Sequence, residues 1–252
     1  MTKTIAIAGK GGTGKTTFSA LLAHWLSGFG TVLAVDADPA SNLHMALGMP
    51  LEDTVGDIRE VMLQDVKRGT FVAGMSKQEY LEWKINQAIV EGQRIDLVAM
   101  GRPEGPGCYC AANNMLRTCL DQLQTGYDYV VIDNEAGMEH LSRQTTRDVD
   151  VLFLISDASL RGLSTAVRMQ ELIHELRTTV GRVVLIVNRI RDEIPPVLLE
   201  AIAAGRLELL GTLPDHPAVR EYDAEGRPLA HLPADDPLRR RVIELAQQVG
   251  LP

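Results

Sequence analysis

The sequence predicts a doubly wound α/β fold, with a mostly parallel sheet of about seven strands flanked by helices. Short apolar runs alternate along the chain with segments whose apolar residues recur at helical spacing. Most of these runs lack polar alternation, which is typical of strands buried on both faces of a sheet. The 252 residues, 45% of them hydrophobic, are enough for one large domain over residues 1–252 with a sizeable core.

The predicted strands share a high content of aliphatic side chains. In chain order they are 4–9, 31–38, 95–101, 129–134, 151–156, 182–189 and 207–214. Two amphipathic helices are indicated by spacings of three and four residues. The first carries Phe18, Leu21, Leu22, Trp25 and Leu26, and the last carries Leu238, Val242, Leu245, Ala246 and Val249. Residues 54–92 have helix-like patterns with no strand between them, so we interpret this segment as a helical insertion.

The charge and hydropathy of the chain exclude several function classes. The formal net charge is −8, which disfavours a general electrostatic attraction to nucleic acid or to anionic lipid. No apolar stretch reaches the length of about 18 residues that a membrane span needs, and the N-terminus does not have the pattern of a signal peptide. The sequence therefore predicts a cytoplasmic protein that binds neither nucleic acid nor membrane.

A phosphate-binding loop is indicated where the first strand meets the first helix. Residues 9–17, GKGGTGKTT, match the pattern G-x-x-x-x-G-K-[ST] in the strand, loop and helix context that it requires. In such a loop backbone N–H groups wrap the phosphates, a lysine reaches the outer phosphates and a hydroxyl ligates Mg²⁺. We assign nucleotide binding to Gly11, Gly12, Thr13, Gly14, Lys15, Thr16 and Thr17, with Thr16 as the magnesium ligand.

A second lysine, Lys10, lies in the same loop, where by itself it would be interpreted as a solvated charge. Together with DADPASNL and DNEAGMEHL further along, however, KGGTGKTT resembles the deviant Walker A ATPase family. That family includes the septum-site and plasmid-partition ATPases, the arsenite-pump ATPase, the nitrogenase iron protein and the nickel-insertion ATPases. The resemblance implies a homodimer in which Lys10 crosses the interface to the ATP of the other subunit.

Acidic residues follow two of the predicted strands at the sheet edge where ligands of open α/β folds gather: Asp36, Asp38 and Asp133. Asp133 is our candidate for holding magnesium through a water molecule. Asp38 matches the family aspartate that precedes proline, and we expect it to orient or activate the hydrolytic water and, like Asp133, to hold magnesium through water. A helix N-cap or turn role remains open for Asp36 and Asp38. The residues expected to sense the γ-phosphate are Asn134, Glu135 and Gly137.

The resemblance also implies where the nucleotide base lies. In the family an asparagine after a late strand recognises adenine and a proline-containing loop packs on the ring, which corresponds here to Asn188 and to Pro214 with Asp215. A guanine-binding Lys-x-Asp signature is missing from these segments. ATP and ADP are therefore favoured over guanine nucleotides, and Asp38, Lys10 and Lys15 are the predicted catalytic residues.

Two of the three cysteines, Cys108 and Cys110, are separated by a single residue. A disulfide between them would close a small strained ring, and a reducing compartment disfavours it. Two thiolates form only half of a typical four-ligand metal site, and the six histidines are scattered singly. A two-fold dimer would bring four sulfur atoms to one ion. Cys119 is most simply a buried core residue.

The Cys-x-Cys pair and DNEAGMEHLSR are most similar to the nickel-insertion ATPases that serve carbon monoxide dehydrogenase. The resemblance implies that ATP binding and hydrolysis are coupled to capture and release of Ni²⁺, with carbon monoxide dehydrogenase as the client. Thiolates also accept Zn²⁺ or Cu(I), so the identity of the metal rests on the resemblance.

Two rival functions remain open. An ATP-dependent positioning or partition switch would use the final segment, where Arg239, Arg240 and Arg241 lie beside an apolar helix face, to bind membrane or DNA. The spacing of its apolar residues favours a helix packed on the core instead. An iron–sulfur cluster carrier would use the same Cys-x-Cys site.

Overall fold

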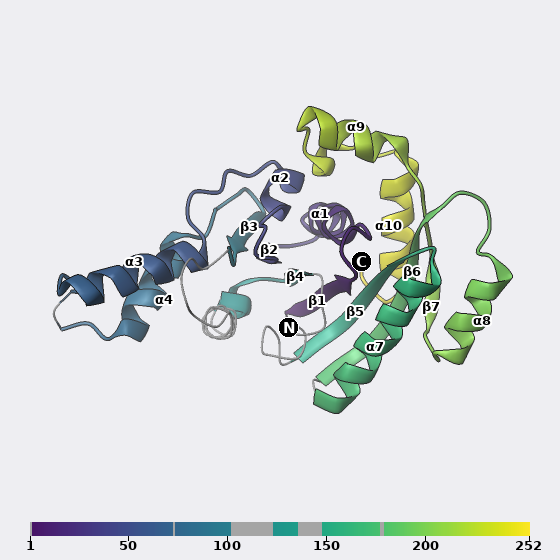
Figure 1. The fold of residues 1–252 in the computed structure, drawn as a ribbon. Coiled ribbons are helices and arrows are strands. Elements are labelled where there is room, and N and C mark those ends of the chain that lie inside the picture. The colour runs from purple at the N-terminus through teal and green to yellow at the C-terminus, as the bar shows by residue number, and fades with distance from the viewer. Residues whose placement is uncertain (1, 73, 102–122, 136–147, 177–178) are drawn as a thin grey trace.

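The computed structural model describes residues 2–72, 74–101, 123–135, 148–176 and 179–252 (Figure 1). Seven strands form one sheet in the order β3-β2-β4-β1-β5-β6-β7, and all six neighbouring pairs are parallel. The strands are β1 (Lys3–Gly9), β2 (Val32–Ala37), β3 (Ile95–Ala99), β4 (Tyr129–Asn134), β5 (Asp148–Asp157), β6 (Thr179–Ile190) and β7 (Leu209–Pro214). The predicted parallel α/β fold is confirmed.

Helices cover both faces of the sheet, as a doubly wound fold requires. The core on one face contains side chains of α1 (Lys15–Leu26), α2 (Leu43–Leu47) and α10 (Pro237–Gln248), with α9 (Pro217–Glu225) packed partly on it. The opposite core contains side chains of α3 (Val55–Arg68), α4 (Lys77–Gln87), α7 (Leu160–Leu176) and α8 (Pro196–Ala204). Figure 1 shows α1 and α10 on one side of the sheet and α7 on the other. Two short 3-10 turns are η1 (Gln124–Gly126) and η2 (Leu229–His231).

The packing of the central strand β1 explains why the apolar segments of the sequence lack polar alternation. Ile5 and Ile7 belong to the core under α1, whereas Ala6 and Ala8 belong to the core under α7. Successive side chains of a strand point to opposite faces, so a strand between two helical layers must be apolar throughout. The predicted phosphate loop therefore follows a strand, β1, that is held by side-chain packing on both faces of the sheet.

Helices α3 and α4 lie in the segment between α2 and β3. Each begins with a capping box, in which a hydroxyl and an acidic residue three positions later satisfy each other's backbone N–H groups: Thr54 with Asp57, and Ser76 with Glu79. Figure 1 shows the pair lying beside the β3 edge, away from α10.

Several boundaries differ from the sequence prediction. Strands β5 and β6 each begin three residues early, at Asp148 and Thr179, because these polar residues pair with each other and extend the ladder beyond the apolar runs. Strand β7 begins at Leu209 instead of residue 207. Helix α2 has only five residues and α9 has no buried residue, so neither shows a helical periodicity in the sequence.

Candidate functional site

The candidate site lies at the carboxyl ends of β1, β2, β4 and β6. The loop after β1 turns through Gly12 and Gly14, whose φ angles of 75° and 96° favour glycine. Gly14 is also the N-cap of α1, and no side chain of the described residues caps this helix. The first amides of α1 are thus available to an anion, as a phosphate loop requires.

Lys15 is the first residue of α1 and is only 7% exposed. Burial lowers the pKa of its ammonium group, while the nearby carboxylates of Asp133, Asp38 and Glu135 oppose the shift. The structure therefore brings the loop lysine together with three acidic side chains from the ends of β2 and β4.

Asp133, at the end of β4, accepts hydrogen bonds from two hydroxyl groups of α1. The Oγ1 atom of Thr16 lies 2.6 Å from Asp133 Oδ2, and the Oγ atom of Ser19 lies 3.1 Å from Oδ1. Burial raises the pKa of Asp133 to about 6, although the bond from Thr16 opposes the shift. Asp36 lies opposite on β2, in register with Asp133, and burial raises its pKa to about 7.

These oxygen donors fit magnesium. A hydroxyl and carboxylates are hard ligands, and Mg²⁺ at nucleotide sites usually keeps water molecules and takes few ligands from the protein. Within the described residues, no three His, Cys, Asp or Glu side chains form a metal-binding group. The structure places the Thr16 hydroxyl and the Asp133 carboxylate, both predicted magnesium ligands, next to each other.

Asp38 lies in a tight turn after β2. Its Oδ1 atom accepts the N–H of Ala40 at 2.9 Å, and its carbonyl oxygen accepts the N–H of Ser41 at 2.9 Å. Asp36 accepts the N–H of Leu43, the first residue of α2. The structure therefore contains the turn and capping contacts that the sequence left open for both residues, and it places the half-exposed Asp38 close enough to Lys15 to influence its pKa.

Lys10 is separated from this acidic group. Its Nζ atom lies 3.5 Å from Oδ2 of Asp157, at the end of β5, with both side chains partly exposed. Asp157 also accepts a hydrogen bond from Ser159 at 2.5 Å. The two lysines of the loop thus have different environments, one buried among carboxylates and one at the surface.

Asn134 follows Asp133 at the end of β4. Its side-chain N–H donates to the carbonyl oxygen of Ile7 at 3.0 Å, whereas its Oδ1 atom is buried without a hydrogen-bond partner among the described residues. A buried acceptor without a partner is costly, so a donor from a ligand or from a rearranged loop would stabilise it. Glu135 is half-buried beside it, and Gly137 lies outside the described residues.

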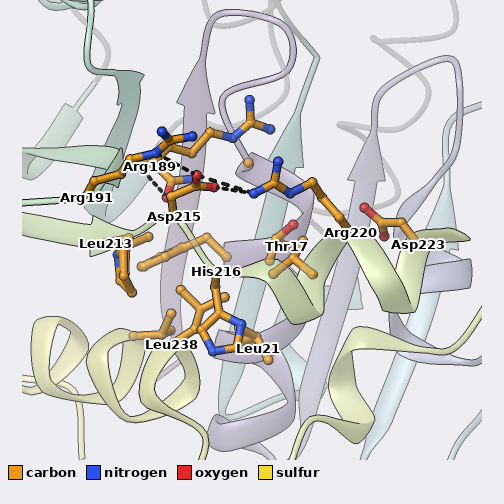
Figure 2. A pocket seen from close by; sticks show the side chains of 16 residues that line it. Thr17, Leu21, Arg189, Arg191, Leu213, Asp215, His216, Arg220, Asp223 and Leu238 are labelled. Carbon is orange, nitrogen blue, oxygen red and sulfur yellow. Dashed lines mark hydrogen bonds and ion pairs between the residues drawn. The ribbon is translucent and has the colours of Figure 1, made fainter.

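A cavity of about 410 Å³ adjoins the loop on the side of β6 and β7 (Figure 2). Among the residues that line it are the predicted Asn188, Pro214 and Asp215, together with Gly14 and Thr17. Figure 2 shows Leu213, Leu238 and His216 on the inner side of the cavity, while the guanidinium groups of Arg191 and Arg220 approach Asp215 at the other side. Both arginines lie 3.3 Å from the Asp215 carboxylate.

Asn188 makes contacts that the sequence did not suggest. Its Nδ2 atom donates to the carbonyl oxygen of Thr13, in the phosphate loop, at 2.7 Å. Its Oδ1 atom accepts the N–H of Arg189 at 2.7 Å. A side chain expected to contact the base thus also supports the loop that would hold the phosphates.

Other residues of the site were missed by sequence reasoning. Ser19 could have been found, since it is a polar residue on the buried face of α1, one turn after Thr16. Asp157, Arg191 and Arg220 carry no motif that distinguishes them from ordinary surface charges. The predicted metal ligands Cys108 and Cys110, and also Cys119, lie outside the described residues.

Comparison with known proteins identifies the family. The CobQ/CobB/MinD/ParA nucleotide binding domain matches residues 4–229. The chain belongs to this family of P-loop ATPases. An uncharacterized ATP-binding protein of Methanocaldococcus jannaschii is 46% identical to the ATPase over 246 residues, covering 97% of each chain.

Two further relatives bear on the ATPase. The carbon monoxide dehydrogenase accessory protein CooC of Rhodospirillum rubrum is 33% identical over 240 residues, covering 88% of this chain and 87% of CooC. The septum site-determining protein MinD of Pyrococcus horikoshii, solved with Mg-ADP, has a TM-score of 0.71 at 23% identity, covering 99% of this chain and 96% of MinD. At that identity the likeness to MinD concerns the fold alone. No helix in the described part of the ATPase has the length and apolar character needed to cross a bilayer.

Proposed function

We propose that this ATPase is a cytoplasmic metallochaperone that binds nickel through Cys108 and Cys110 and supports its insertion into the Ni,Fe cluster of carbon monoxide dehydrogenase. The observation that carries the proposal is the 33% identity to CooC along 88% of the chain. The spacing of the two cysteines adds independent chemical support, because thiolates are suitable ligands for a soft or borderline ion.

The nucleotide site supplies the energy-linked part of this function. ATP is bound with its phosphates on the loop after β1, against the first amides of α1 and the ammonium group of Lys15. Magnesium supplies positive charge beside the phosphates, with the Thr16 hydroxyl as its ligand and Asp133 acting through water. Asp38 orients the attacking water. The cavity beside Asn188, Pro214 and Asp215 receives the adenine base.

A homodimer links this chemistry to the metal. The side chain of Lys10 is partly exposed, and among the described residues its ammonium group is held by a 3.5 Å ion pair with Asp157, so it can move to the phosphates of the other subunit at small cost. An isologous dimer then brings Cys108 and Cys110 of each chain together around one ion, and nucleotide state controls whether that site exists.

The decisive measurement is metal content per chain. Protein loaded with Ni²⁺ should be desalted and analysed in nucleotide-free form, with ADP and with a non-hydrolysable ATP analogue. We expect up to one ion per two chains, with occupancy that changes between the three nucleotide states. Zn²⁺ should be measured in parallel, since it can substitute at a thiolate site.

The Cys108→Ala and Cys110→Ala variants should lose tight metal binding while ATP affinity, measured by calorimetry, changes little. Cys119→Ala is the matched control and should retain the metal. Retention of nickel by both single variants and the double variant would overturn the proposal. Anaerobic reconstitution with iron and sulfide tests the carrier alternative, because a coloured cluster with no nickel binding would contradict a nickel site.

A further inference from the structure

We propose that Asp36 is a positioning residue for ATP hydrolysis, because its carboxylate joins the two ends of the turn that carries Asp38. The Oδ1 atom of Asp36 accepts the N–H of Asp38 at 3.1 Å, and the Oδ2 atom accepts the N–H of Leu43 at 2.8 Å. One side chain thereby holds both ends of residues 38–43. This inference rests on the proposed role of Asp38 in orienting the attacking water.

The anchor itself is rigid. Asp36 is only 1% exposed and lies within β2, between the neighbouring strands β3 and β4. Its neighbours in register are Ala99 and Asp133, so its backbone is fixed by ladders on both sides. A carboxylate mounted on an interior strand of a sheet defines a position more sharply than one mounted on a loop.

The turn that it holds is not relaxed. Ser41 has a φ angle of 49°, a left-handed conformation that is uncommon for residues other than glycine. Local contacts stabilise it: the N–H of Ser41 donates to Asp38 O at 2.9 Å, and His44 Nδ1 lies 2.6 Å from Ser41 O. Without the two bonds to Asp36, the ends of the turn would be free to separate and the strain at Ser41 would be released.

Hydrolysis is sensitive to such a displacement. A misplacement of a catalytic group by about 1 Å can cost a factor of about 100 in rate. Binding of the nucleotide depends instead on the loop after β1 and on α1, which make no hydrogen bond to Asp36 in the described structure. Loss of the Asp36 contacts should therefore lower the rate of hydrolysis and leave the affinity for ATP nearly unchanged.

The test compares Asp36→Ala and Asp36→Asn with wild type in single-turnover hydrolysis, alongside ATP affinity from calorimetry. We expect Asp36→Ala to lower the hydrolysis rate about 100-fold, with a change in Kd below about threefold. Asp36→Asn has the same size and keeps one acceptor oxygen, so its rate should lie between the other two. Hydrogen exchange across residues 38–43 should be faster in both variants, and more so in Asp36→Ala.

The control is Asp128→Ala, since Asp128 accepts the N–H of Thr31 at 2.8 Å at the opposite edge of the sheet. It should leave the hydrolysis rate unchanged even if it lowers the melting temperature. A lower rate for Asp36→Asn than for Asp36→Ala would overturn the positioning role, because Asn keeps one of the two acceptors and Ala keeps neither. So would normal turnover or unchanged exchange in Asp36→Ala. Asp38→Ala, measured in parallel, distinguishes failure of the proposed role of Asp38 from failure of the role of Asp36. If Asp38→Ala is active, the role assigned to Asp38 is wrong. If Asp38→Ala is inactive but Asp36→Ala is active, only the positioning role of Asp36 is refuted.

Discussion

Asn188 connects the two ends of the nucleotide site. Asn188 is 8% exposed, and its carboxamide lies between the backbone of the phosphate loop and the backbone of Arg189, near the end of β6. A side-chain Cβ at Gly14 would collide with this carboxamide, so the loop and the asparagine are packed directly against each other. The adenine contact implied by family resemblance and the loop support seen in the structure are compatible, because a primary amide has a second N–H and a second oxygen lone pair.

The adenine contact and the loop support, the two roles of Asn188, lead to different predictions for ligands that have phosphates but no base. Asn188→Ala removes the partner of the buried Thr13 carbonyl, at a cost of about 1–3 kcal/mol. We therefore expect weaker binding of both ATP and inorganic triphosphate, measured by calorimetry. Asp215→Ala is the control, because it alters only the base end and should leave triphosphate affinity unchanged. Normal triphosphate binding by Asn188→Ala would show that the residue serves the base alone.

How far sequence could predict the site differs from residue to residue. The phosphate-loop residues 9–17 were predicted because their chemistry requires a fixed local pattern, and in the structure they run from the last residue of β1 into the first turn of α1. The contact from Asn188 to Thr13 joins residues 175 positions apart in sequence and depends on how β6 passes the loop. No local pattern encodes such a distance. The same holds for Lys10 and Asp157, which are 147 positions apart.

At the scale of elements, the sequence located the buried strands better than their ends. Apolar runs mark where a strand is covered on both faces, but β5 and β6 continue to Asp148 and Thr179, where backbone pairing alone maintains the ladder. Helix α2 has five residues, shorter than the two turns needed to show a periodicity. Its start is defined by the bond to Asp36, which is a tertiary contact.

Helix α10 shows how the structure decides between two functions for the same element. Leu238, Val242 and Leu245 are buried in the core beneath α1. Arg239 donates to the carbonyl oxygen of Leu232 at 2.7 Å, and Arg241 donates to that of Thr212 at 3.0 Å. An apolar face that is already buried, with arginines bound to the protein itself, favours packing over a membrane-binding role.

We predict that Arg239→Ala destabilises the fold, because it removes the bond to Leu232 and a 3.0 Å contact with His24 Nδ1. Burial, and then the charge of Arg239, lower the pKa of His24, so that its neutral ring can accept this bond. A loss of about 1–3 kcal/mol corresponds to a fall of roughly 2–4 °C in melting temperature per kcal/mol.

Arg240→Ala is the matched control, since Arg240 is exposed on the same helix and its loss should change stability by less than about 0.5 kcal/mol. Neither substitution should affect sedimentation with anionic vesicles, which we expect to stay at background with and without ATP. Vesicle binding that requires ATP and is lost in either variant would instead favour the positioning switch.

At the scale of the whole molecule, the strand order brings the charged residues of the candidate site together at the carboxyl ends of the strands. Strand β1 lies at the centre, with β4, β2 and β3 on one side and β5, β6 and β7 on the other. The loop after β1 therefore lies where the chain divides between the two halves, a position at which open α/β sheets bind ligands. Acidic groups at the ends of β2 and β4 lie on one side of it and Asp157, with Lys10, on the other.

This arrangement leads to a prediction about assembly. Lys15 is buried, whereas the side chain of Lys10 is partly exposed, so we expect Lys15 to serve its own subunit and Lys10 to reach a second one. We expect the ATPase to dimerise with a non-hydrolysable ATP analogue in sedimentation velocity, and Lys10→Ala to bind the analogue but stay monomeric.

Lys3→Ala serves as the control, because Lys3 is an exposed lysine at the opposite edge of the sheet, and it should dimerise normally. Nickel content measured on the same samples tests whether metal binding depends on dimerisation. If two chains are needed to complete a four-thiolate site, Lys10→Ala must lose nickel although both of its cysteines are intact. Full nickel occupancy in monomeric Lys10→Ala would show that one chain holds the ion unaided, and a nucleotide-gated site shared between two subunits would then be excluded.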